Sequence, residues 1–238
     1  MDNAGYITLT RLSGLRREMQ VIAHNIANSS TAGFRREGVV FSEFVVGAER
    51  HEPSLSMALG NTRQTYQLQG GLSMTGGSFD MAIEGEGFFQ VETADGPRLT
   101  RAGIFTPNEA GELVNMDGHR VLDLGGAPIF VPPDARNIGL ARDGTLSADG
   151  EPIAQVGIVR PVDPVTMSRQ AGTLFFVDGE VEPVIAPAVL QGFVEESNVD
   201  PIIELTRMIE VQRAYERGMK FLESEDERIK SVVQTLGR

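Results

Sequence analysis

Three carboxylates lie close together in the sequence, at Asp80, Glu84 and Glu86, and their residue type could support general acid–base chemistry. They surround an apolar run, however, so turn and surface positions explain them better than a catalytic pair does. The nearby fragment Gly85–Gly87 lacks the third glycine and the following helix of a dinucleotide site. P-loop, HExxH and GxSxG motifs are absent from the 238 residues. We therefore predict no catalytic residue and no enzymatic activity.

Metal-binding chemistry is equally weakly supported. The three histidines, His24, His51 and His119, are too scattered to give a metal-ligand spacing, and cysteine is absent. The Asp-Gly pairs of the sequence lack the alternating acids and closing glutamate of an EF-hand. Turn formation explains these pairs better, and we predict neither a metal site nor a cofactor.

The charge balance limits the possible partners. A formal net charge of -12 and a pI near 4.7 argue against nucleic acid, since the pairs Arg16–Arg17 and Arg35–Arg36 are too short to form a basic patch. No apolar stretch approaches the roughly 18 residues that span a bilayer, so we expect no membrane insertion. The first residues lack the basic-then-apolar order of a secretory signal, which taken alone indicates the cytoplasm.

The first 30 residues have a clear helical period. Apolar residues recur at steps of three and four, which is the narrow stripe of a coiled coil. They are Leu12, Leu15, Met19, Ile22 and Ile26. We predict a helix over residues 4–28, about 37 Å long at 1.5 Å per residue, capped by Asp2 or Asn3.

The C-terminal segment repeats this pattern over a longer stretch. Asp200 is the expected N-cap and Pro201 the first helical residue, and Gly237 is the expected stop. The same steps select Leu205, Met208, Gln212, Tyr215, Met219, Leu222, Asp226, Ile229, Val233 and Leu236. Packing of both helices on a globular core is the alternative, but their outer faces are densely charged. We predict that the two helices pair with each other, antiparallel, and with helices of other chains.

The middle of the chain has a different composition. It holds most of the 27 glycines and every proline except Pro201, too many for helices. Asp-Gly, a strong hairpin signal, separates short apolar runs at Asp95-Gly96, Asp117-Gly118, Asp143-Gly144, Asp149-Gly150 and Asp178-Gly179. The runs are residues 87–91, 120–122, 129–131, 155–159 and 174–177. We predict a mostly antiparallel β domain over residues 76–190.

These segments together predict an α+β fold in which a β domain is inserted between two terminal helices. The expected divisions are an N-terminal coiled-coil helix (1–33), an extended linker (34–75), the central β domain (76–190) and a C-terminal coiled-coil helix (191–238). Within the linker, residues 47–75 are polar and are expected to be extended or poorly ordered.

Two polar corners join the predicted helices to the β domain. The chain leaves the first helix through HNIANSSTAGFRRE and returns through GFVEESNVDP. Asn, Ser and Gly in these stretches end or cap helices. The residues that we expect to form the junction are Asn25, Asn28, Thr31, Gly33, Phe34, Asn198, Asp200 and Pro201.

The same corners and the β segment resemble the flagellar axial proteins, which form the rod, the hook and the hook-associated structures. Ala27–Arg35 is similar to the pattern ANxxTxGFK/R, and Thr75–Phe89 is similar to TGxxxDxAIxGxGFF. Leu99–Phe105 matches YTRxGxF with Leu in place of Tyr, and His24 stands where the family commonly has Asn. The matches continue through residues 111–114, 118–122, 197–201 and 208–216, in the family's order and over nearly the whole chain.

The resemblance implies a structural subunit of the basal-body rod, the hollow shaft that carries torque from motor to hook. The start of the chain and its length resemble a proximal rod subunit, and a distal rod or other hook-type subunit is the nearest alternative. The implied partners are copies of itself, proximal and distal rod proteins and the flagellar type III export apparatus. The implied location is the rod within the periplasm, in place of the cytoplasm.

The resemblance also implies an assembly interface on the terminal helices. Its expected residues are Leu12, Leu15, Met19, Ile22, Ile26, Leu205, Met208, Tyr215, Met219, Leu222, Ile229 and Val233. Two other classes of function stay open on the residues alone. One is a β-domain enzyme or small-ligand binder, and the other is a cytoplasmic coiled-coil adaptor.

Overall fold

A computed structural model describes residues 3–46 and 55–236 of the chain. They form two compact units, each assembled from segments that are distant in sequence. Among the described residues, the first unit comprises 3–27, 36–46, 55–66 and 199–236, and the second comprises 28–35 and 67–198. The expected cap at Asp2, the expected stop at Gly237 and residues 47–54 of the expected linker lie outside the described residues.

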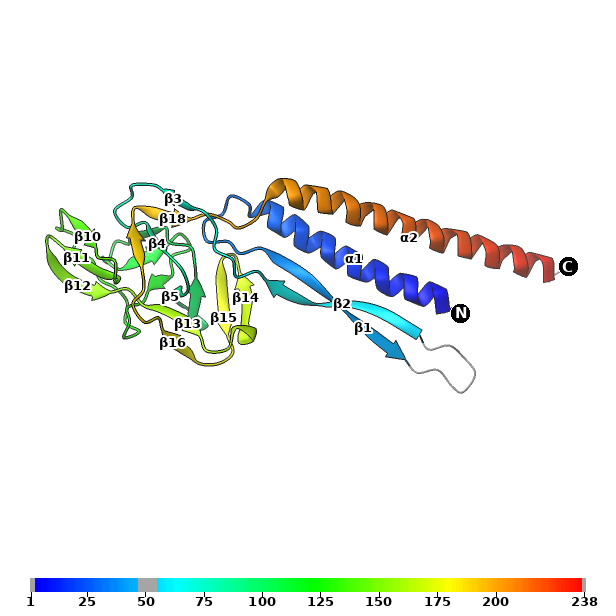
Figure 1. The fold of residues 1–238 in the computed structure, drawn as a ribbon, viewed down its shortest axis with the longest axis horizontal. Coiled ribbons are helices and arrows are strands. Elements are labelled where there is room, and N and C mark those ends of the chain that lie inside the picture. The colour runs from blue at the N-terminus through cyan, green and yellow to red at the C-terminus, as the bar shows by residue number, and fades with distance from the viewer. Residues whose placement is uncertain (1–2, 47–54, 237–238) are drawn as a thin grey trace. The chain divides into compact units, whose positions relative to one another are not determined.

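The first unit contains two helices and a β-hairpin (Figure 1). Its elements are α1 (Asn3–Ala27), β1 (Glu37–Val46), β2 (Leu55–Thr65) and α2 (Pro201–Leu236). Both helices begin within one residue of the predicted positions. The strands pair antiparallel from Glu37 opposite Thr65 to Val46 opposite Leu55, so part of the segment expected as an extended linker is a hairpin.

The hairpin lies against α1 at a glycine. A Cβ on Gly14 would lie 2.6 Å from Cε1 of the Phe41 ring, which is closer than real side chains pack. The missing side chain therefore lets the ring approach the helix backbone, which explains a glycine in the middle of a helix despite its cost of about 1 kcal/mol.

The second unit is built almost entirely of short strands. They are β3 (Leu72–Met74), β4 (Met81–Ile83), β5 (Phe88–Thr93), β6 (Gly96–Thr100), β7 (Phe105–Pro107), β8 (Leu113–Asn115), β9 (Arg120–Val121), β10 (Ile138–Leu140), β11 (Thr145–Ala148), β12 (Glu151–Gln155), β13 (Ile158–Pro161), β14 (Met167–Ala171), β15 (Leu174–Val177), β16 (Val181–Pro183), β17 (Val189–Gln191) and β18 (Phe193–Glu195). One 3-10 turn, Pro164–Thr166, precedes β14.

The strands of the second unit form one large sheet and three small ones. The large sheet has the order β14-β15-β6-β5-β9-β8-β7, and β13 joins it by pairing with β5 and β16. The small sheets are β10-β11-β12, β17-β4 and β18-β3. Every described strand pair is antiparallel, which confirms the α+β prediction with a central antiparallel β region.

Four of the five Asp-Gly pairs form the expected hairpins. They connect β5 to β6, β8 to β9, β10 to β11 and β11 to β12, and their glycines have φ between 81° and 100°. Asp178-Gly179 differs because it joins β15 to β16, which pair with other strands. The run at residues 129–131 also differs, since Phe130 forms only an isolated bridge to Glu112.

Two apolar clusters form the core of the second unit, a large one and a small one made of Phe88, Leu99, Val159 and Phe175. The buried members of the large cluster include Met81, Ile83, Phe89, Val91, Phe105, Leu113, Val121, Ile129, Leu146 and Ile158. The rings of Phe89 and Phe105 meet edge to face with centroids 5.2 Å apart.

Neither described helix has the length and hydropathy of a membrane span.

Candidate assembly and junction sites

The two helices pack together through apolar side chains that come from both ends of the chain. The buried members of this cluster are Leu12, Leu15, Ile22 and Val211, and the half-buried members are Met19, Ile26, Met208, Ala214, Tyr215 and Leu222. Leu12 lies against Gly218, whereas Glu18 pairs with Arg207, so the helices run in opposite directions. All five residues predicted on the first helix and three predicted on the second are thus brought together.

The contact line on α2 has a different phase from the predicted stripe. It passes through Met208, Val211, Tyr215, Gly218 and Leu222, again in steps of three and four. The two lines share Met208, Tyr215 and Leu222. Between these residues the predicted stripe takes a step of four and then a step of three, whereas the observed line takes a step of three and then a step of four. Val211, which is 7% exposed, was missed for this reason.

Four of the predicted interface residues lie on exposed parts of α2. Leu205 is 51% exposed, Met219 38%, Ile229 47% and Val233 64%. They are not members of the apolar cluster between α1 and α2, and their role in contacts with other molecules stays a prediction.

An ion pair fixes the register between the helices. Arg207 donates from Nε and Nη2 to Oε1 of Glu18, at 3.0 and 2.8 Å. Burial alone would lower the pKa of Arg207, but the hydrogen bonds and the charge of Glu18 outweigh it and raise that pKa. A partly buried polar contact of this kind penalises a slipped pairing, as polar seam residues do in paired helices.

Asn25 organises the exit of the chain from α1. Its Nδ2 donates to the carbonyl oxygen of Glu37 at 2.8 Å and to Oε2 of Glu204 at 3.1 Å, and its Oδ1 accepts from the N–H of Glu37 at 3.0 Å. Arg36 donates from Nε to Oε1 of Glu204 at 2.5 Å. Nδ1 of His24 lies 3.6 Å from Oε2 of Glu37, so the histidine is adjacent to this network. The predicted junction residue Asn25 therefore links α1, β1 and α2.

The start of α2 confirms the predicted cap. Oδ1 of Asp200 accepts from the N–H groups of Ile202 and Ile203 at 2.9 and 3.2 Å, and Pro201 is the first helical residue. These bonds satisfy amide groups that lack a partner within the helix.

The remaining junction residues lie together in the second unit. The Thr31 hydroxyl donates to Oδ1 of Asn28 at 3.2 Å, and the N–H of Asn198 donates to the carbonyl oxygen of Phe34 at 3.3 Å. Phe34 is fully buried and lies under the guanidinium of Arg169, 4.3 Å from the ring centroid. Phe34 is thus the hydrophobic contact that anchors this corner.

Gly33 makes the closest backbone approach of this corner. Its N–H donates to the carbonyl oxygen of Glu195 at 2.7 Å, and its φ is +70°. A Cβ at this position would lie 2.2 Å from the amide nitrogen of Ala102, so only glycine fits here.

A buried group of three charged side chains near this corner was not predicted from the sequence. Glu195 receives Arg35 on Oε1 and Arg101 on Oε2, each at 2.9 Å, and all three side chains are at most 4% exposed. We call this group the Arg–Glu–Arg cluster. Oε1 of Glu195 also accepts from the N–H of Gly70 at 3.2 Å. Arg35, Arg101 and Glu195 belong to three distant parts of the sequence, and no spacing rule connects them.

Backbone carbonyl groups complete the coordination of the two arginines. Arg35 donates to the carbonyl oxygens of Gln67, at 3.0 Å, and Leu68. Arg101 donates to the carbonyl oxygen of Gly85 at 2.6 Å. Burial lowers the pKa of Arg35 to about 10 against the opposing attraction of Glu195, and burial also lowers the pKa of Arg101.

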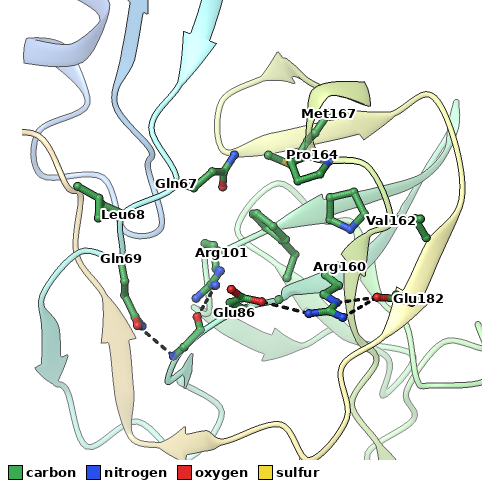
Figure 2. Close-up of a pocket in the computed structure, with 14 residues that line it drawn as sticks. Gln67, Leu68, Gln69, Glu86, Arg101, Arg160, Val162, Pro164, Met167 and Glu182 are labelled. Carbon is green, nitrogen blue, oxygen red and sulfur yellow. Dashed lines mark hydrogen bonds and ion pairs between the residues drawn. The ribbon is translucent and has the colours of Figure 1, made fainter.

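A cavity of about 640 Å³ opens beside Arg101. Figure 2 shows Glu86, Arg160 and Glu182 joined by ion pairs at its edge, with distances of 3.2 Å to Glu86 and 2.7 Å to Glu182. Apolar residues, among them Leu68, Phe88, Val162, Pro164 and Met167, line much of the rest.

Each of the three neighbouring carboxylates, Asp80, Glu84 and Glu86, has a polar or basic partner. Glu84 pairs with Arg142 at 2.7 Å, Glu86 pairs with Arg160, and Asp80 accepts from the Thr75 hydroxyl at 2.5 Å. Within residues 3–46 and 55–236, no group of three His, Asp or Glu side chains is placed to hold a metal ion. The arrangement therefore fits surface and turn roles for these acids.

Three family models match successive parts of the chain. The model "Flagella basal body rod protein" matches residues 6–35, "Flagellar hook protein FlgE/F/G D1 domain" matches residues 82–148, and "Flagellar basal body rod FlgEFG protein C-terminal" matches residues 190–235. The first and third cover α1 and α2 with their corners, and the second covers much of the β unit.

Curated relatives match the chain from end to end. The flagellar basal-body rod protein FlgF of Caulobacter vibrioides is 36% identical over 249 residues, covering 100% of this chain and 99% of the relative. FlgF of Mesorhizobium japonicum is 36% identical over 241 residues with the same coverage, and the rod protein FlgG of Bacillus subtilis is 29% identical over 96% of this chain and 97% of its own. The chain therefore belongs to the family of flagellar basal-body rod proteins.

Proposed function

We propose that the chain is a proximal rod subunit that assembles through its terminal helices into the hollow shaft of the flagellum. Its family supports a structural role in the basal body and no enzymatic one. FlgF relatives are 33–36% identical over the full chain, whereas the FlgG relatives reach 29–32%, which favours FlgF over the distal alternative.

One observation carries this proposal: α2 has an apolar side that α1 leaves uncovered. Ile202 is 75% exposed, Ile203 59%, Leu205 51% and Ile209 50%. Soluble monomers rarely expose such a continuous apolar stripe, and exposed patches of this kind mark interaction surfaces. Helices of neighbouring rod subunits, with apolar stripes of their own, are its proposed partners.

The proposal also covers the geometry of the two helices, the contacts between subunits and the partners of the chain. α1 and α2 form an antiparallel coiled coil, supported by the steps of three and four that run through their contact line. Contacts between subunits are head-to-tail, as an open helical shaft requires. Partners include copies of the chain, other rod proteins and the type III export apparatus in the cell.

Deletion of the gene in the bacterium that encodes it tests the proposed function. We expect isolated basal bodies to end at a short rod stub without hook or filament when imaged by electron microscopy. The intact gene supplied in trans should restore the full structure. Complete rods and filaments in the deletion strain would contradict the proposal.

Two aspartate substitutions on α2 separate packing within the chain from packing between chains. Val211→Asp buries a charge in the contact with α1 and should lower the free energy of unfolding of the first unit by about 3–5 kcal/mol. Leu205→Asp changes an exposed residue, so stability of the free protein should change by less than about 0.5 kcal/mol. Circular dichroism during urea unfolding measures both effects.

Motility provides the second readout for these two variants. Cells that carry Leu205→Asp should not swim, because the charge would lie in the proposed contact with a neighbouring subunit. Soft-agar swarming at normal protein levels measures this outcome. Normal swarming of that variant would remove Leu205 from the assembly interface.

A further inference from the structure

Each helix of the first unit has a second stripe of residues, which stays exposed when the two helices pack together (Figure 1). We call these two sets the outer stripe of α1 and the outer stripe of α2, and every side chain in them is exposed. The outer stripe of α1 is Ser13, Arg16, Gln20, Ala23 and Ala27. The outer stripe of α2 is Leu205, Ile209, Gln212, Glu216 and Met219.

The outer stripes follow the contact lines between the helices, one residue later along the chain. The contact line of α1 begins at Leu12 and Leu15, and its outer stripe begins at Ser13 and Arg16. On α2 the contact line passes through Met208, Val211, Tyr215 and Gly218, and each of these residues is followed directly by a member of the outer stripe. One residue turns an α-helix by about 100°. Each helix therefore has two stripes with steps of three and four, about 100° apart, and only one of them is used within the chain.

The antiparallel register within the chain predicts a register for the outer stripes. Leu12 lies against Gly218, and one further residue on each helix gives the layer Ser13 with Met219. The following layers come from the steps of three and four, taken in opposite directions along the two helices. They are Arg16 with Glu216, Gln20 with Gln212, Ala23 with Ile209, and Ala27 with Leu205.

The apolar layers match in size. The three apolar residues of the α2 outer stripe, Leu205, Ile209 and Met219, each face an alanine or the serine of the α1 outer stripe. A small side chain on one helix leaves space for a large one on the other, as interdigitating helix surfaces require. The two stripes are thus complementary in shape at three of their five layers.

The two polar layers match in chemistry. Gln20 and Gln212 each have an amide that can donate and accept a hydrogen bond. Arg16 and Glu216 have opposite charges, and within the described residues Arg16 forms no salt bridge or hydrogen bond. Glu216 accepts only from Nε2 of Gln212, at 3.1 Å, in that same part of the chain. Both charges are therefore available to a partner in this register.

We propose that the outer stripe of α1 packs antiparallel against the outer stripe of α2 of a second copy, in this register. Arg16 of one copy pairs with Glu216 of the next, and Ile209 packs against Ala23. The inference rests on the proposed rod function and identifies the two surfaces that adjacent copies use.

The agreement of all five layers is the reason for choosing a second copy as the occupant. Both surfaces belong to this chain, and they cannot meet within one chain because its helices already pack through their contact lines. The surfaces differ, so each copy that makes the contact keeps one stripe for a further copy, which is a head-to-tail arrangement. The next layer would place Leu9 against Glu223, so the matched contact ends at Ser13 and is about 21 Å long at 1.5 Å per residue.

The register also sets the displacement between copies. Within one chain Arg16 is level with about residue 214, because it lies four residues after Leu12 and Leu12 lies against Gly218. Its proposed partner Glu216 lies two residues further along α2. Adjacent copies should therefore lie side by side, displaced by about 3 Å along the helix axis.

Cysteine cross-linking in isolated basal bodies tests the register, and the chain has no native cysteine. One copy carries Ala23→Cys and a second copy, with a different epitope tag, carries Ile209→Cys, so a disulfide between these positions joins two chains. Oxidation should give a linked species that contains both tags. Ser13→Cys with Met219→Cys, placed on two copies in the same way, should give the same result.

The matched control recombines the same positions. Ser13→Cys with Ile209→Cys should give little linked species, because ten residues separate Ile209 from the proposed partner of Ser13, which is about 15 Å and too far for a disulfide. Equal yields from the control and the two proposed pairs would overturn the register. Absence of the species with both tags, or a link only to a different rod protein, would overturn the choice of a second copy.

Charge reversal tests the polar layer of the contact. Arg16→Glu in the copy with Ala23→Cys should lower the yield about tenfold, because two acids then face each other. Glu216→Arg in the copy with Ile209→Cys should have the same effect. The two reversals together restore opposite charges and should recover most of the yield, which two misfolded chains would not do. A combination that stays as low as the single reversals would refute the pairing of Arg16 with Glu216.

These outcomes separate the contact from the proposed function. Complete rods in the gene-deletion strain would reject the rod function itself. A deletion strain that stops at a stub and is restored by the cysteine copies, with neither proposed pair cross-linked, would leave the rod function standing and reject the contact between the outer stripes.

Discussion

Glu195→Gln should lower the stability of the β unit by about 3–5 kcal/mol, the cost of leaving buried charges without their partner. In the native protein one carboxylate serves two guanidinium groups, each at 2.9 Å. The amide that replaces this carboxylate would offer one neutral acceptor in place of two charged ones. Arg35 and Arg101, whose side chains are at most 4% exposed, would then stay buried with only carbonyl groups to compensate their charges.

The charge count of the Arg–Glu–Arg cluster predicts an order among variants. Arg35→Met leaves the pair Arg101–Glu195, which is neutral, so it should cost less than Glu195→Gln even though the carbonyls of Gln67 and Leu68 lose a donor. Glu196→Gln is the matched control, because the neighbouring Glu196 is exposed, and its effect should stay within about 0.5 kcal/mol.

Differential scanning calorimetry measures this series, with urea unfolding followed by circular dichroism as a second readout. A loss of 3–5 kcal/mol corresponds to a Tm lower by about 10 °C for a protein of this size. If Arg35→Met proves more damaging than Glu195→Gln, the excess positive charge is not what Glu195 compensates, and packing of the Arg35 side chain would explain the cluster.

The local patterns of the sequence predicted the elements well because their causes are local. The cap at Asp200, the first helical residue Pro201 and four Asp-Gly hairpins each depend on residues a few positions apart. A helix period is likewise visible within one segment, and it placed Leu12, Leu15 and Ile22 correctly on the packed side of α1.

The parts that were missed depend on contacts between distant residues. Val211 and Leu205 both fit a step of three or four from Met208, and only the position of α1 decides which of them is buried. Arg35, Arg101 and Glu195 are 66 and 94 residues apart along the chain, so nothing local indicates that they meet. The hairpin β1–β2 was missed because β2 lies in the segment read as polar, which carries little apolar alternation, so the apolar strand β1 had no visible partner strand in the sequence.

Gly33→Ala is the second change with a large expected effect, and two separate causes combine in it. The φ of +70° is unfavourable for a residue with a Cβ by about 1–2 kcal/mol. The new Cβ would also lie 2.2 Å from the Ala102 nitrogen and 2.3 Å from the Arg101 carbonyl carbon. These neighbours are backbone atoms, so they cannot rotate away as a side chain could.

Gly76→Ala isolates the first of these causes. Gly76 has almost the same φ, +74°, in the same unit, but nothing lies within 4 Å of its added Cβ. The control should therefore lose only about 1–2 kcal/mol, whereas Gly33→Ala should lose more than about 3 kcal/mol. Calorimetry of the two purified variants gives the difference directly. Equal losses would show that the corner can move away from Ala102, and that the close approach at Gly33 does not hold residues 28–35 to the β unit.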